Sequence, residues 1–288
     1  NNHNTNFINM KNKVHPCIWF DGQAQEAARF YCGIFNNARI TADTPMVVNF
    51  EIGGKKFMGL NGGPMFKVNP SISFFVKCES LAQTNAVWDK LSEGGKALMD
   101  IGTYPWSERY GWIQDKFGVS WQVMLHYQEG TPQSISPAML FTHAQLGRAE
   151  EAIKCYTALF PDSASIRLER YPAEDKVHAG MLMYSEFSLA SCDFIAMDGP
   201  GGHDFIFNEA ISFVVECDTQ DEIDQYWNAL TEGGAESMCG WLKDRFGVSW
   251  QIIPRVLGKL VSDPERGARV MQALMKMKKL DLHQLENA

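Results

Sequence analysis

A short segment occurs twice in this chain, and this repeat constrains the fold more than any other feature. The first copy, Asp-Lys-Phe-Gly-Val-Ser-Trp-Gln, occupies residues 115–122; the second, Asp-Arg-Phe-Gly-Val-Ser-Trp-Gln, occupies residues 244–251. Each copy predicts a turn followed by a strand with alternating faces. A repeat of this kind indicates duplicated units. Gln122 and Gln251 are polar residues at mid-strand, which makes them the first candidates for a site.

Two further matches support the duplication, and they pair residues 22–31 with 147–156 and residues 72–79 with 211–218. The distance between matched residues first grows and then shrinks, so each half carries one extra segment. The extra segment lies at about 100–109 in the first half and at about 171–202 in the second, and both are expected to form loops. The halves are therefore diverged duplicates whose pockets need not do the same thing.

Hydrophobic periodicity predicts an α+β fold made of βαβββ units. In the first half, a strand, a helix and three strands are expected at 14–20, 23–35, 39–41, 46–52 and 56–60. The same order follows at 71–78, 81–91, 97–101, 110–114 and 119–125. One unit cannot bury its sheet face alone, so the two should pair. The expected organisation is a disordered leader (1–12), a first domain (13–130), a Pro/Ser linker (131–137), a second domain (138–260) and a helical tail (261–288).

Composition restricts the classes of partner. A net charge of −8 argues against nucleic acid and anionic membranes, which bind clustered Lys and Arg. No apolar run reaches the roughly 18 residues that cross a bilayer. The seven cysteines are odd in number and form no CxxC pair, which favours reduced thiols in a cytoplasmic protein. The expected partner is a small molecule.

Four segments resemble the PhnB-like branch of the vicinal oxygen chelate superfamily, which carries the label 3-demethylubiquinone-9 3-methyltransferase. These segments are residues 19–27, 60–64, 104–112 and 241–251. The superfamily also holds glyoxalase I, extradiol dioxygenases and the fosfomycin- and bleomycin-resistance proteins. The resemblance implies two tandem glyoxalase/bleomycin-resistance-like domains, each of two βαβββ modules that form a curved mixed sheet around a cleft.

The resemblance also implies where the metal ligands of the superfamily's enzymes fall. The glutamate that completes their metal set falls on Gln122 and Gln251, and the remaining positions fall on Ser71, Ala210, Pro16 and Phe141. None of these is a strong metal ligand. A complete metal site is therefore not expected, and no cofactor is predicted; a divalent metal is the alternative.

Methyl transfer, which the family label names, has no sequence support. A glycine-rich loop between a strand and a helix is the expected site for a nucleotide-like cofactor. The paired glycines at 53–54, 62–63, 94–95 and 233–234 instead end helices or form turns.

Two histidines offer the alternative site. His143 is expected on the first strand of the second half, and His203 lies in the Gly-rich segment 198–203. With Gln251 they could hold a divalent metal or act as an acid/base pair. The competing interpretation is a strand histidine bonded to a backbone carbonyl and a loop histidine in solvent.

Aromatic residues near the repeats are candidates for the wall of an apolar cleft. Strand alternation turns Trp121 and Trp250 away from the glutamines and into the core, whereas Trp112 and Trp241 are less constrained. Glu51 and Glu186 could each act as a lone base or be structural. The cleft candidates are Gln122, Trp112, Ser71, Ser73, Glu51, Asn61, Gln251, Trp241, Ser212, His143 and His203.

Two hypotheses of function follow. The first is a small-molecule-binding protein without a bound metal. The alternative is a metal-dependent lyase or dioxygenase-type enzyme that uses the second half. In both, the two halves should form an intramolecular pseudo-dimer, and a homodimer is a further alternative.

Overall fold

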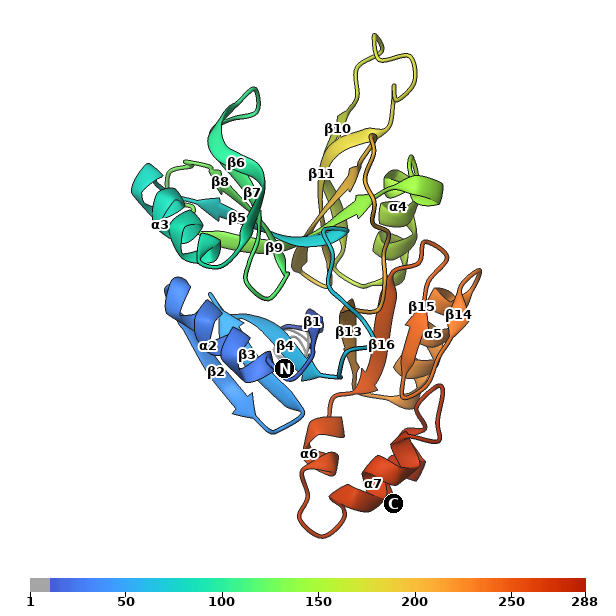
Figure 1. Cartoon of the computed structure of the whole chain (residues 1–288). Coiled ribbons are helices and arrows are strands. Elements are labelled where there is room, and N and C mark those ends of the chain that lie inside the picture. Colours follow the sequence, from blue (N-terminus) through green and yellow to red (C-terminus); the bar gives the residue numbers. More distant parts are fainter. Residues whose placement is uncertain (1–10) are drawn as a thin grey trace.

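The computed structural model describes residues 11–288, which form two similar halves of two βαβββ modules each (Figure 1). Most of the predicted leader, 1–12, lies outside the described residues. Module 1 consists of β1 (Val14–Phe20), α2 (Ala24–Ile34), β2 (Ala38–Asp43), β3 (Val47–Ile52) and β4 (Lys55–Asn61). Module 2 consists of β5 (Ile72–Cys78), α3 (Leu81–Ser92), β6 (Lys96–Tyr104), β7 (Ser107–Gln114) and β8 (Ser120–Leu125). The element order predicted for the first half is confirmed.

The second half repeats this order with a short 3₁₀ turn and a helical tail added. Module 3 consists of β9 (Ser134–Phe141), η1 (His143–Gln145), α4 (Ala149–Leu159), β10 (Ala164–Arg170), β11 (Leu182–Leu189) and β12 (Cys192–Asp198). Module 4 consists of β13 (Ile211–Cys217), α5 (Gln220–Thr231), β14 (Ala235–Glu236), β15 (Trp241–Lys243) and β16 (Ser249–Pro254). The tail contains α6 (Leu257–Val261), α7 (Gly267–Leu274) and α8 (Leu282–Glu286).

The modules combine into two eight-stranded mixed sheets, and each sheet takes one module from each half. Sheet A has the order β14-β15-β16-β13-β1-β4-β3-β2, and sheet B has the order β10-β11-β12-β9-β5-β8-β7-β6. The modules join through antiparallel pairs of first strands, β1 with β13 and β5 with β9. The residues predicted as a linker, 131–137, are partly strand, because β9 begins at Ser134 and pairs with β5.

The two modules of one half pack together through their helices rather than edge to edge. Ala24, Ala27, Ala28 and Tyr31 form the buried face of α2. The Tyr31 hydroxyl donates to Asp115 Oδ2 of module 2 at 2.6 Å. Modules 1 and 2 therefore share a core although they belong to different sheets.

Asp115 explains most of the repeated segment. Its carboxylate also accepts hydrogen bonds from Trp121 Nε1 and from the backbone N–H groups of Phe117 and Val119. In the second half, Asp244 binds Tyr156, Trp250 and two backbone N–H groups in the same way. Trp121 and Trp250 are fully buried, which confirms their predicted place in the core.

The extra segments distinguish the halves. The predicted addition at 100–109 forms the long β6–β7 hairpin, whose counterparts β14 and β15 are short. The tail occupies the end of β15, where Cys239 N donates to Met277 O and Gly240 N donates to Lys278 O. In the second half most of the addition lies at residues 171–181, because β11 and β12 are the counterparts of β3 and β4. The connection from β12 to β13 is also longer than the one from β4 to β5, by two residues.

No helix within residues 11–288 is long and apolar enough to cross a membrane. All seven cysteines lie in the described chain, and each is free.

Candidate functional site

Each sheet has one face that packs on the helices and one that faces away from them, and strand alternation decides which residues lie on which. In β8, Trp121 and Val123 belong to the core, so Gln122 lies on the opposite face. Trp112 and Phe75 are its cross-strand neighbours on that face. We call the side of sheet B that carries Ser73, Phe75, Tyr110, Trp112 and Gln122 face B.

A polar group of three side chains lies at the centre of face B. Gln122 is only 6% exposed. Its Oε1 atom accepts a hydrogen bond from the Tyr110 hydroxyl at 2.5 Å, and its Nε2 atom donates to Ser73 Oγ at 2.9 Å. Burial raises the pKa of Tyr110 well above its ordinary value, so this phenol stays a neutral donor.

Apolar and aromatic side chains surround this polar group. Phe75, Tyr110, Ala138 and Ile195 form a buried cluster separate from the main core. Partly buried residues extend it, namely Met99, Tyr104, Trp112, Met124, Tyr184 and Met197. At one end, the Trp106 ring stacks on Tyr104 at 5.0 Å and meets Tyr110 edge-on at 5.3 Å. Face B is thus a mostly apolar surface with a few placed polar groups, as ligand sites usually are.

Buried polar atoms without a hydrogen-bond partner gather on these faces. Within residues 11–288 there are six such side-chain atoms, and strand parity places all six on the faces turned away from the helices. Those on face B are Trp112 Nε1, Ser120 Oγ and Tyr184 OH. The Tyr184 hydroxyl lies near Glu186 but makes no hydrogen bond to it. Burial raises the pKa of Tyr184, and the Glu186 charge adds to this. Buried polar groups cost free energy unless bonded, so water or a ligand is expected to complete them.

A cavity of about 940 Å³ opens at the β6–β7 side of face B. Met99, Trp112 and Gln114 line one wall. The connection that carries His203 to Asn208 lines the other, together with Lys243 of sheet A. Trp112 therefore combines an unpartnered indole N–H with a position on a cavity wall.

The equivalent side of sheet A, face A, repeats part of this arrangement; it carries His15, Cys17, Trp19, Ser212 and Gln251. Gln251 Nε2 donates to Ser212 Oγ at 3.0 Å, as Gln122 does to Ser73. The third neighbour of the glutamine differs, because Cys17 lies here and Tyr110 lies beside Gln122. Burial raises the pKa of the Cys17 thiol to about 12, although hydrogen bonds with Gln251 and Ser212 lower it. Trp241 meets Trp19 edge-on at 6.1 Å. The unpartnered atoms here are His15 Nε2, Asn49 Oδ1 and Ser249 Oγ.

Glu51 and Glu186, the two candidates for a general base, are each paired with a cationic side chain. Glu186 lies 3.2 Å from Lys77 Nζ on the outer part of face B. Glu51 lies 3.4 Å from Arg39 on sheet A.

The sequence-derived candidates separate into three groups. Gln122, Trp112 and Ser73 come together on face B, with Ser71 buried just before β5. Gln251, Trp241 and Ser212 come together on face A, and Glu51 lies on an outer strand of that sheet. Asn61 and His143 do not join either group, and His203 lies across the cavity from Trp112.

The prediction that Asn61 lines a cleft is wrong, because its side chain faces α2. Its Oδ1 atom accepts the N–H of Ala24 at 2.9 Å, and Nδ2 donates to Gln25 Oε1 and Pro45 O. Asp198, at the matching end of β12, accepts the N–H groups of Gly147 and Ala149. Both residues secure the start of a helix.

The prediction that His143 lies on the first strand of the second half is also wrong. His143 lies in η1, after β9 has ended at Phe141. It is exposed, and its Nε2 atom donates to the backbone oxygen of His203 at 2.6 Å. Gln251, by contrast, has its contacts with Ser212 and Cys17. The metal-ligand position predicted on the first strand of the second half, Phe141, is also wrong. Pro16 pairs with Phe213, and Pro137 pairs with Phe74, the counterpart of Phe213. Pro137 is therefore the counterpart of Pro16.

Tyr110, Tyr184 and Cys17 were missed by sequence reasoning. Tyr110 lies two residues before Trp112 in the same strand, so alternation from Trp112 would have found it. Cys17 lies next to Pro16, the predicted metal-ligand position, and on the opposite face of β1. No cluster of three or more His, Cys, Asp or Glu suited to a metal ion occurs within residues 11–288.

Comparison with solved structures defines the class of protein. Glyoxalase I from Zea mays aligns over 83% of this chain and 90% of its own, with a TM-score of 0.55 and 12% sequence identity. The fold is therefore that of the glyoxalase-like, vicinal oxygen chelate proteins, arranged as two similar halves.

The sequence profile described as 3-demethylubiquinone-9 3-methyltransferase matches residues 12–124 and 133–253, and the chain belongs to this PhnB-like family. The PhnB protein of Bacillus cereus is 32% identical over 38% of this chain and 96% of its own, with a TM-score of 0.37. A Pseudomonas aeruginosa protein is 23% identical over 40% of this chain, with a TM-score of 0.36. No curated protein matches the chain.

Proposed function

We propose that this protein binds a small, largely apolar molecule on face B without a bound metal, and that its two halves act as an intramolecular pseudo-dimer. One observation carries the proposal: Trp112 lines the 940 Å³ cavity while its indole N–H is buried and unpartnered. An indole N–H can only donate. A ligand with a carbonyl, ether or carboxylate oxygen would complete this N–H after a small shift of the side chains that cover it, and the apolar part of the ligand would cover the aromatic surface.

The donor groups on face B support a metal-free site. The glutamine that takes the place of the superfamily's metal-binding glutamate uses both ends of its amide for Tyr110 and Ser73. Its strand neighbours across the sheet include Phe75 and Trp112. A neutral amide, a hydroxyl and aromatic rings do not form a ligand set for a divalent cation. A metal does not fit the residues present, and we derive no step through one.

The test is a binding screen in which one indole is altered. Small apolar compounds with a hydrogen-bond acceptor are ranked by the rise in melting temperature of the full chain. Trp112→Phe removes the N–H but keeps an aromatic ring, so the best compound should bind about tenfold more weakly, equivalent to about 1.4 kcal/mol. Trp241→Phe is the matched control, because Trp241 is the counterpart of Trp112 on face A.

Three outcomes would oppose the proposal. Equal loss of affinity in both variants would indicate nonspecific binding, and no loss in Trp112→Phe would place the compounds elsewhere. Stoichiometric zinc, nickel, manganese or iron in the purified protein, with a matching rise in melting temperature, would favour a metal enzyme. S-adenosylmethionine in the same screen tests the activity that the family description names, and no stabilisation is expected.

A further inference from the structure

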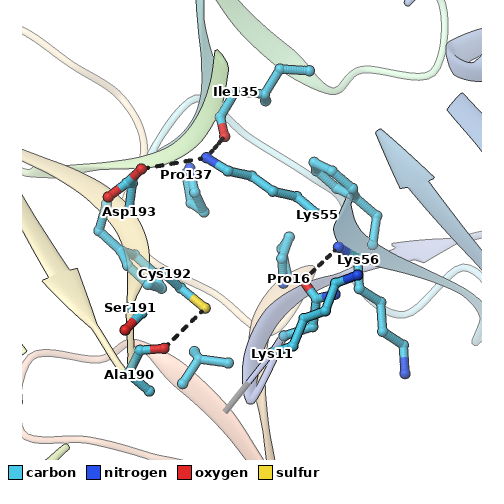
Figure 2. Close-up of a pocket in the computed structure, with 14 residues that line it drawn as sticks. Lys11, Pro16, Lys55, Lys56, Ile135, Pro137, Ala190, Ser191, Cys192 and Asp193 are labelled. Carbon is cyan, nitrogen blue, oxygen red and sulfur yellow. Dashed lines mark hydrogen bonds and ion pairs between the residues drawn. The ribbon is translucent and has the colours of Figure 1, made fainter. Parts of the chain in front are cut away.

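Figure 2 shows the residues that line a second cavity, which has a volume of about 270 Å³. Val14, Phe57 and Phe194 belong to the main core, so the cavity lies on the helix-packed side of the sheets, away from face B. Its walls come from the same strands in each half, β1 with β9 and β4 with β12. Three pairs of counterparts form the apolar lining: Val14 and Ile135, Pro16 and Pro137, Phe57 and Phe194. The cavity therefore lies between the two halves, at the centre of the pseudo-dimer.

The two halves differ in charge at two pairs of lining positions, Lys55 with Cys192 and Lys56 with Asp193, and the first pair faces the cavity interior beside Phe57 and Phe194. Lys55 begins β4, and Cys192 begins its counterpart β12. Cys192 is kept neutral because burial raises the pKa of its thiol. The apolar lining is thus matched between the two halves, whereas the lysines among the lining residues come from the first half only.

The ammonium group of Lys55 has few polar neighbours. Figure 2 shows its Nζ atom donating to the backbone oxygen of Ile135, at 2.8 Å, with the Asp193 carboxylate at 3.8 Å. Burial lowers the pKa of Lys55 as the largest effect, and Asp193 opposes it. An ammonium has three N–H donors. The side chain is 36% exposed, so one carbonyl and the Asp193 carboxylate leave at least one N–H that is available to water or to an anion in the cavity.

We propose that this cavity binds a small apolar carboxylate, with the carboxylate on Lys55 and the apolar body between Phe57 and Phe194. The size fits, since a cavity of about 150 Å³ already holds benzene. The charge fits too, because Lys11 and Lys55 both line the cavity, whereas Asp193 is the carboxylate among its lining residues. The neighbouring Lys56 uses its Nζ atom to pair with Glu216 at 3.0 Å.

Such a ligand would contact both halves at once. β1 and β4 belong to the first half, and β9 and β12 belong to the second. Binding is therefore expected to stabilise the association of the halves and to raise the melting temperature of the whole chain. This site is separate from face B, so each can exist without the other.

The test uses benzoate and benzyl alcohol on the full chain. Benzoate should raise the melting temperature and bind with a Kd below about 10 mM, the range expected of a ligand with so few atoms. Lys55→Met should weaken benzoate at least about tenfold and leave benzyl alcohol unchanged, because only the charge is lost. Lys55→Arg should retain benzoate, which shows that Lys55→Met fails through charge and not through misfolding.

Two further variants locate the site. Lys77→Met, a lysine from the ion pair on face B, and Trp112→Phe should both leave benzoate affinity unchanged. The proposal is overturned if benzoate does not saturate the wild-type chain, or if Lys55→Met binds it as well as wild type does. It is also overturned if Trp112→Phe abolishes binding, because benzoate would then lie on face B.

Discussion

Asp115 and Gln122 stand at the two ends of one repeated segment but serve different parts of the molecule. Asp115 joins a helix of module 1 to the last strand of module 2, with four hydrogen bonds to a carboxylate that is 4% exposed. Gln122 belongs to face B. The segment is similar in both halves because the same helix–strand connection is made twice, by Asp115 and by Asp244.

Replacement of Asp115 tests this connection. In Asp115→Asn, two of the four N–H and O–H donors must face the amide NH₂, because each carboxylate oxygen accepts two of them and an amide keeps only one oxygen. We expect the free energy of unfolding to fall by about 2–4 kcal/mol, the range for a broken buried charge network. Urea denaturation measures this loss. Glu129→Gln, at an exposed loop position, is the control and should change little. A loss below about 0.5 kcal/mol in Asp115→Asn would refute the role.

The buried side chain of His15 should make the free energy of unfolding depend on pH. Burial, followed by the nearby Lys56 charge, lowers its pKa to about 3, with Arg255 adding to this and the Asn12 carbonyl opposing it. A lowered histidine pKa gives stability that is present above the unfolded pKa of about 6.5 and is lost as pH falls toward 3. Between pH 7 and 5, wild type should lose about 2 kcal/mol more than His15→Gln does. Parallel denaturation curves at the two pH values measure the difference, and equal losses would contradict it.

Strand alternation is the part of the site that sequence predicts well. It separated Gln122 and Gln251 from Trp121 and Trp250 correctly, because the period of two holds throughout an uninterrupted strand. It failed for His143, because η1 is inserted between β9 and α4, and counting back from the helix passes over this turn. A short turn without Pro or a repeated Gly leaves no clear mark in the sequence.

The helical tail shows how one element replaces another. In the first half, the long β6–β7 hairpin borders face B. In the second half, where β14 and β15 are short, the tail packs at their end through a cluster of Val270, Leu274, Leu280 and Leu285. Cys239 and Ile253 are partly buried against this cluster.

Leu280→Ala tests whether the tail shields this part of sheet A. Leu280 is fully buried and lies against Gly240, so its loss should cost about 2–5 kcal/mol of stability if the tail unfolds together with the chain. If the tail opens locally, the cost is smaller, and Cys239 should react faster with a thiol reagent. Leu81→Ala, at an exposed helix start, is the control. An unchanged reaction rate combined with unchanged stability would show that the tail packing is unimportant.

At the scale of the whole molecule, the sequence predicted the modules and their order but not which modules share a sheet. β1 and β5 have similar patterns, so each could pair with any first strand of suitable length. The choice depends on contacts between residues far apart in the chain, such as Val14 with Val215 and Ile72 with Met139. Local periodicity carries no information on these pairs.

This arrangement makes the two halves depend on each other. A chain divided between Gly130 and Thr131, in a loop near the predicted boundary, leaves β1 and β5 of the first fragment without their partners β13 and β9. Unpaired strand edges associate readily. We therefore expect the fragments 1–130 and 131–288, when produced together, to purify as one complex with the stability and circular dichroism of the intact chain. The first fragment alone should form dimers, in which β1 and β5 pair between copies. Size-exclusion chromatography with light scattering separates these cases. A stable, monomeric first fragment would show that the sheets do not require both halves.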